Sequence, residues 1–157
     1  AMENMDTPTA LIFSRQNVND LPAGTKYSGV EKGAYEVVAE ANPDVVLVAS
    51  GSEVSTLAEA ATLLAVDGIK ARVVSCPSEG LFRRQSKEYQ ESILPSGVKT
   101  FALTAGLPVI FEGLVGANGR VYGLDSFGFS APFKVLDEKL GYTAQNMYNE
   151  IKKFLAE

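Results

Sequence analysis

The fold of this chain is decided by Val45-Val46-Leu47-Val48-Ala49, by Ser50-Gly51-Ser52-Glu53 directly after it and, beyond a helical stretch, by Ala71-Arg72-Val73-Val74-Ser75. Both apolar runs are rich in β-branched residues, which is typical of parallel strands that are buried on both faces. A strand, a helix and a second strand in this order form a βαβ unit with parallel strands and a right-handed crossover. The stretch therefore predicts an α/β fold.

The helix between the two strands has its own start and stop signals. Ser50 and Glu53 have the spacing of a capping box, in which each side chain accepts a hydrogen bond from the other residue's backbone amide. Gly68 is placed to end the helix in a left-handed turn. The residues expected on its buried face recur at helical spacing: Val54, Leu57, Ala61 and Leu64.

The rest of the chain extends this unit on both sides. Further strands are predicted at residues 34–38, which form an edge strand, 100–104 and 120–124. A looser helical stretch is predicted to start at residues 77–79. Further helices are predicted after Ser86, around residues 109–114, after Ser130 and after Thr143, with serine or threonine as the capping residue in several of them. The order alternates between strands and helices, which predicts a three-layer α/β/α sandwich with a mostly parallel sheet.

An apolar run near the N-terminus stands apart from this pattern. Thr9-Ala10-Leu11-Ile12-Phe13 has the composition of a strand buried on both faces, and Arg15 follows at its carboxyl end. An arginine there can bind a phosphate or carboxylate through two parallel hydrogen bonds. Residues 18–33 mix Asn, Asp, Pro, Gly and Lys and are predicted to be a linker. We therefore interpret the first residues as the end of a neighbouring domain that carries one piece of its active site.

Composition excludes several classes of function. The chain has 157 residues, enough for one domain, and its net charge of −5 disfavours nucleic acid as a partner. No apolar stretch approaches the length of a membrane span, no signal peptide is visible, and a single cysteine fits the cytoplasm. The chain contains no histidine, the commonest general base and metal ligand. Cys76 is therefore expected to be a buried small hydrophobe, because no histidine can activate it.

Several segments together resemble the transketolase family. The match keeps its order over nearly the whole chain and rests on these segments: Thr9 to Asn17 with its ending Ser14-Arg15-Gln16-Asn17, Ala49 to Val54, Ala71 to Ser75 with Pro77-Ser78, Phe127-Gly128 followed by Ser130-Ala131-Pro132, and Gly141-Tyr142-Thr143. Ser75-Cys76-Pro77-Ser78 favours transketolase over related families with the same domain. Thr104 departs from the family pattern, in which many members have a glutamate at this position.

The resemblance implies a domain division and a function. Residues 1–19 would be the remnant of the pyrimidine-binding domain, 20–33 a linker, and 34–157 the C-terminal domain, which supports assembly of a homodimer. The intact enzyme would use thiamine diphosphate and Mg²⁺ to transfer a two-carbon ketol unit between sugar phosphates of the pentose phosphate pathway. Its cofactor would lie between the first two domains, so none is expected on this chain alone, which would be inert. Arg15 would contact the substrate phosphate, and no catalytic residue lies in this chain.

Three alternatives stay open at the level of sequence. The same domain of dihydroxyacetone synthase shares the family signatures. A regulatory module could bind a nucleotide or a sugar phosphate at the predicted strand ends near Ser50, Ser75 and Thr104. There, Ser50-Gly51-Ser52 at a helix N-terminus could bind an anion, but helix capping is favoured because Glu53 would repel it. A stand-alone enzyme would need carboxylates or lysines as its acid and base, and no constellation of them is visible.

Overall fold

A computed structural model describes residues 4–14 and 16–157 and contains one five-stranded sheet with the strand order β1-β3-β2-β4-β5. Strands β2 to β5 are parallel, and β1 pairs antiparallel with β3 at one edge. The predicted mostly parallel sheet is thereby confirmed. The strands are β1 (Tyr35–Val38), β2 (Val45–Ala49), β3 (Ala71–Ser75), β4 (Lys99–Leu103) and β5 (Arg120–Tyr122).

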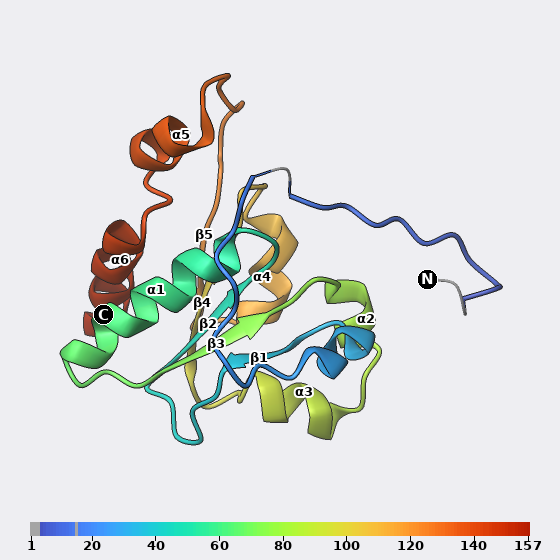
Figure 1. Cartoon of the computed structure of the whole chain (residues 1–157). Helices are drawn as coiled ribbons and strands as arrows, with labels where there is room; N and C mark the ends of the chain where they lie inside the picture. The colour runs from blue at the N-terminus through green and yellow to red at the C-terminus, as the bar shows by residue number, and fades with distance from the viewer. Residues whose placement is uncertain (1–3, 15) are drawn as a thin grey trace.

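Helices cover both faces of the sheet, as the three-layer prediction requires (Figure 1). Two long helices, α1 and α6, pack on one face, and three short ones, α2, α3 and α4, pack on the other. A 3-10 helix precedes the sheet. The helices are η1 (Tyr27–Lys32), α1 (Glu53–Val66), α2 (Glu79–Arg83), α3 (Lys87–Ile93), α4 (Val109–Val115), α5 (Phe133–Leu140) and α6 (Ala144–Ala156).

Strand β2 lies at the centre of the core, and all five of its residues are fully buried. Successive side chains of a strand point to opposite faces of the sheet. Accordingly Val45 and Leu47 pack in the hydrophobic cluster with α1 and α6, whereas Val46 and Val48 pack with α2, α3 and α4. This explains why the strand reads as a continuous apolar run rather than an alternating one.

The final helix is held by a cap and by packing. The Thr143 hydroxyl accepts a hydrogen bond from the backbone amide of Asn146 at 3.3 Å, which confirms the predicted cap. Met147, Ile151 and Phe154 recur at helical spacing and are buried against the sheet. Helix α6 is thus the partner that covers the face of the sheet beside α1.

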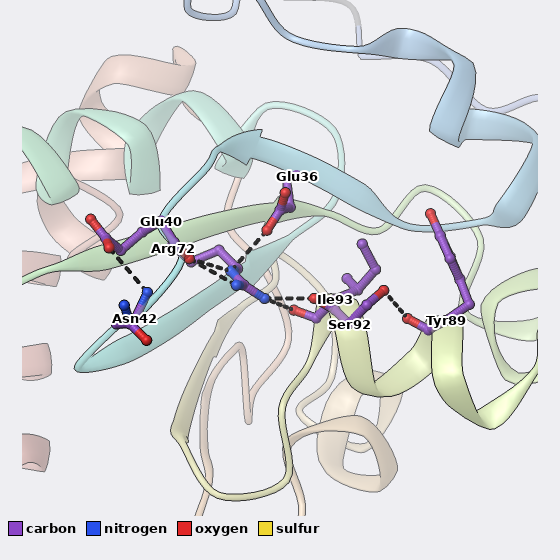
Figure 2. Close-up of polar contacts among 7 residues, drawn as sticks. All are labelled: Glu36, Glu40, Asn42, Arg72, Tyr89, Ser92 and Ile93. Carbon is purple, nitrogen blue, oxygen red and sulfur yellow. Dashed lines mark hydrogen bonds and ion pairs between the residues drawn. The ribbon is translucent and has the colours of Figure 1, made fainter.

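One charged side chain is buried in the sheet itself (Figure 2). Arg72 of β3 is 6% exposed, and its Nε lies 2.9 Å from a carboxylate oxygen of Glu36 on β1. Its Nη2 donates to the carbonyl of Glu40 at 2.8 Å, in the loop from β1 to β2. Its Nη1 donates to the carbonyls of Ser92 at 2.7 Å and Ile93 at 3.2 Å, which end α3. One guanidinium therefore joins the edge strand, a loop and a helix C-terminus.

Two predicted helix starts are wrong in detail. Helix α1 begins after Ser52, whose hydroxyl donates to Glu53 Oε1 at 2.8 Å, and no side chain caps the helix. The capping box of Ser50 and Glu53 does not form: Gly51 is left-handed, and α1 begins at Glu53 with Ser52 as the residue before it, two positions later than the spacing assumes. Helix α5 begins after Pro132 without a side-chain cap, so Ser130 does not cap it, and no α5 residue is buried.

The N-terminal apolar run does not form the predicted strand. Residues 9–13 lie outside the sheet, and the side chain of Ile12 is 94% exposed. A strand needs a neighbour for its backbone amides and carbonyls, and the described sheet ends at β1 and β5 without reaching this segment. In Figure 1 the segment runs outward from the body of the protein. The apolar composition of residues 9–13 is therefore not used by this chain's own core.

None of the helices in residues 4–14 and 16–157 combines the length and the apolar character that crossing a bilayer would take.

Candidate functional site

The strand order places the expected ligand site at the carboxyl ends of the neighbouring strands β2 and β4. Helix α1 leaves β2 toward one face of the sheet, and α4 leaves β4 toward the other. In open α/β sheets a crevice opens where two such connections diverge, and ligands bind there. The polar residues Ser50, Ser52 and Glu53 follow β2, and Thr104 follows β4.

Thr104, at the carboxyl end of β4, is held by a tyrosine. The Tyr142 hydroxyl donates to the Thr104 carbonyl at 2.8 Å, and the Thr104 hydroxyl accepts from the Gly106 amide at 3.1 Å. Tyr142 packs edge-on against Tyr122, with ring centroids 5.6 Å apart. Burial, with smaller effects from Tyr122, Glu53 and Asp125, raises the pKa of Tyr142 to about 12. The tyrosine therefore stays protonated and acts as a hydrogen-bond donor.

We expect Tyr142→Phe to lower the free energy of unfolding by roughly 1–2 kcal/mol, because the buried Thr104 carbonyl loses its donor. Tyr148→Phe is the matched control, since the Tyr148 hydroxyl donates to Asp67 at an exposed site and water can replace it. Urea unfolding of both variants measures the difference. Equal losses would show that the bond to Thr104 contributes nothing specific.

Glu53 is the half-buried acid at this edge of the sheet. Burial raises the pKa of its carboxyl, and Asp137 on α5 adds to the rise, while the hydrogen bond from Ser52 opposes it. Burial also raises the pKa of Asp137. A carboxyl with a raised pKa can exchange a proton closer to neutral pH. Among the described residues, the side-chain hydrogen-bond partner of Glu53 is Ser52, whose hydroxyl is not a second acid or base, so no catalytic pair is formed here.

The structure brings together two of the three residues predicted for the alternative ligand site. Ser50 and Ser75 line one cavity of about 780 Å³ at the carboxyl ends of β2 and β3, together with Glu53. The outer wall of this cavity is the N-terminal segment, including Ser14 and Gln16. Thr104 does not line it and is instead bonded to Tyr142.

Arg15 and Cys76 are the other residues that the sequence singled out. Arg15 lies outside the described residues, although its neighbours Ser14 and Gln16 line the cavity. Cys76 is buried, as predicted, and burial raises the pKa of its thiol to about 12, so it is not a nucleophile.

The role of Arg72 in joining β1, the loop after it and α3 was not predicted from the sequence. The signal was present, because an arginine inside a strand buried on both faces must be paired with acceptors.

The part of the chain that the structure describes was compared with the side-chain clusters that bind metal ions. Within residues 4–14 and 16–157, His, Cys, Asp and Glu side chains form no group of three or more that could hold a metal ion. The Mg²⁺ of a diphosphate cofactor needs carboxylate or carbonyl oxygens beside the phosphates. The described residues supply no such cluster of carboxylates.

Comparison with known proteins gives one consistent result. Residues 33–143 match the family model described as the transketolase-like C-terminal domain. A transketolase of Staphylococcus aureus (strain MW2) is 44% identical over 155 residues, which is 96% of this chain and 23% of that protein. The solved transketolase of Leishmania mexicana superimposes with a TM-score of 0.82 at 34% identity, over 90% of this chain and 20% of that one.

A second solved structure is a Pichia stipitis transketolase in complex with sedoheptulose-7-phosphate, with a TM-score of 0.80 at 32% identity over 90% of this chain and 20% of that one. The chain thus spans about a quarter of the length of the relatives that it matches. Because the family model covers well over half of the chain, and the fold and the sequence agree with it, this chain belongs to the transketolase family, as its C-terminal domain.

Proposed function

We propose that this domain serves a transketolase that transfers a two-carbon ketol unit between sugar phosphates with thiamine diphosphate and Mg²⁺. The observation that carries the proposal is the alignment of 96% of the chain with a transketolase at 44% identity. The relative solved with sedoheptulose-7-phosphate supports a sugar phosphate as the substrate class. The cofactor binds to the part of the enzyme that precedes this domain, and the enzyme works in the cytoplasm.

The domain's own contribution is assembly. It helps to hold two subunits of a homodimer together, and it contributes no catalytic residue. The missing histidine supports this division of labour, since the chain lacks the usual general base. Arg15 is the one residue proposed to touch substrate, through the phosphate, and it belongs to the remnant of the pyrimidine-binding domain at residues 1–19.

The proposed linker, residues 20–33, joins this remnant to the domain at residues 34–157. Two features show that the domain partly orders this linker. Leu21 packs against the larger hydrophobic cluster, and the linker contains the 3-10 helix η1. Just before it, Asn19 Nδ2 donates to Glu59 Oε1 on α1 at 2.9 Å. These contacts support a fixed path of the chain from Asn19 to the sheet.

The test is an assay of the chain alone with xylulose and ribose phosphates, thiamine diphosphate and Mg²⁺. We expect no turnover, because the cofactor site is absent from this chain. A full-length transketolase such as the S. aureus relative, assayed in parallel, is the positive control. Turnover by the isolated chain, retained after further purification, would contradict the proposal.

A further inference from the structure

Large apolar side chains are exposed at one end of this domain. Six of them lie in two segments, at the start of α4 and in the arm from β5 to α5, and together they define the strand-end face: Leu107, Val109, Ile110, Phe127, Phe129 and Phe133. Phe127 is 98% exposed. A concentration of exposed apolar residues on a folded domain marks an interaction surface rather than chance.

The topology explains why the two segments meet. Helix α4 follows the carboxyl end of β4, and the arm follows the carboxyl end of β5, which is the parallel neighbour of β4. The Leu124 amide at the base of the arm donates to the Gly106 carbonyl at 2.9 Å, just before α4. Figure 1 shows the arm and α5 projecting from the body beyond this end of the sheet.

The opposite end of the sheet has a different character. Strands β2 and β3 begin directly after Asp44 and Lys70, and β4 begins with Lys99. The Asp44 carboxylate accepts from the Lys70 amide at 2.8 Å. Of the exposed large hydrophobic residues in the described part of the chain, Val66 at the end of α1 lies at this end and is 83% exposed. Apolar exposure is thus concentrated at the carboxyl ends of the strands.

The N-terminal segment identifies the occupant. Residues 12–14 line the cavity at the carboxyl ends of β2 and β3, so the chain that precedes the domain reaches it at this same end. The exposed Leu11, Ile12 and Phe13 belong to that incoming segment. In the relatives most of the protein lies outside the part that this domain matches, and the matched family model is that of a C-terminal domain. A covalent tether gives the preceding part a high effective concentration at this end.

We propose that the strand-end face is the surface on which the preceding domain of the transketolase chain docks. The arm projects from the body so that its phenylalanines enter that domain's surface. The inference rests on the proposed function. It adds to that function the surface by which the domain joins the rest of the chain and the phenylalanines that anchor it there. Aromatic anchors such as these carry a large share of the binding energy in protein interfaces.

The test uses a full-length chimera, in which this chain replaces the aligned part of the S. aureus transketolase. Hydroxyl-radical footprinting compares the oxidation of Phe127 and Phe129 in the chimera with that in the isolated chain. We expect several-fold slower oxidation in the chimera. The paired substitution Phe127→Lys and Phe129→Lys is expected to lower the thermal midpoint of the chimera but not that of the isolated chain, since both side chains are exposed in the latter.

Val66→Lys is the matched control at the opposite end, and it is expected to leave both proteins unchanged. Turnover of sugar phosphates by the chimera reports on the proposed function, whereas oxidation reports on docking. An active chimera whose phenylalanines oxidise as fast as in the isolated chain would overturn the docking inference alone. Oxidation in the isolated chain that slows with rising protein concentration would also overturn it, because a second copy would then be the occupant.

A chimera that fails to fold is replaced by the natural S. aureus enzyme, which is footprinted over its segments aligned with residues 107–110 and 127–133. Slow oxidation of the side chains there supports the inference. Oxidation at the rate of a fully exposed reference peptide contradicts it.

Discussion

Replacing Arg72 by methionine is expected to lower the free energy of unfolding by roughly 3–5 kcal/mol, because each buried or half-buried carbonyl left without a donor costs about 1–3 kcal/mol. Methionine has a similar length but no donors, so the carbonyls of Glu40, Ser92 and Ile93 lose their partner. The Glu36 carboxylate loses its countercharge at the same time. Urea unfolding followed by circular dichroism measures the change.

Two further variants separate the contributions to this network. Arg72→Lys keeps the charge but cannot reach Glu40 and the end of α3 together, so we expect an intermediate loss. Glu36→Gln is expected to cost at most about 1 kcal/mol, because the Glu36 side chain is 34% exposed and solvent screens the pair. If the methionine variant stays within 1 kcal/mol of the parent, the guanidinium does not hold the edge strand, the loop and the helix together.

Gly33→Ala is expected to lower the free energy of unfolding by about 2–5 kcal/mol. Gly33 has φ +86°, a left-handed conformation that costs an alanine about 1–2 kcal/mol. Its Cβ would also clash with the backbone nitrogen of Phe82 on α2 and with the carbonyl oxygen of Ser78, the N-cap residue of that helix. Backbone cannot move aside as a side chain can, so overpacking adds about 1–3 kcal/mol.

Gly24→Ala is the matched control for this substitution. Gly24 has φ +92° but no atom within 4 Å of an added Cβ, so only the conformational cost of about 1–2 kcal/mol applies. The difference between the two variants in chemical denaturation isolates the contact of the η1 segment with α2. Equal losses would mean that residues 27–33 do not pack against the domain.

The parts of the fold that follow from local pattern could be predicted from sequence. Strand β2, strand β3 and the buried face of α1 are predictable because their burial leaves a periodic signature in the residues themselves. The Thr143 cap and the left-handed Gly68 and Gly141 are likewise set by short-range chemistry. The mostly parallel sheet follows from the order of these elements.

The predictions that were wrong or incomplete concern features that local sequence alone does not determine. The run at residues 9–13 has strand composition, but the described sheet offers it no neighbour. The spacing of Ser50 and Glu53 fits a capping box, yet the backbone at Gly51 decides where α1 begins. The contacts of Arg72 join residues 20 to 36 positions apart in sequence, so no local pattern reveals which residues are its partners.

The candidate site was predictable in place but not in detail. Ser50 and Ser75 do meet at the strand ends, because parallel strands bring their carboxyl ends to one edge. Thr104 was expected beside them. Instead, its carbonyl accepts a hydrogen bond from the hydroxyl of Tyr142, which lies in the turn before α6. That pairing depends on how α6 packs on the sheet, which the sequence pattern does not specify.

The most direct measurement of the central claim is the activity of the full-length chimera that carries this chain in place of the C-terminal part of the S. aureus transketolase. The claim that this chain is a working transketolase C-terminal domain predicts a dimer that turns over sugar phosphates with thiamine diphosphate and Mg²⁺. A folded chimera that binds the cofactor but stays monomeric and inactive would contradict it.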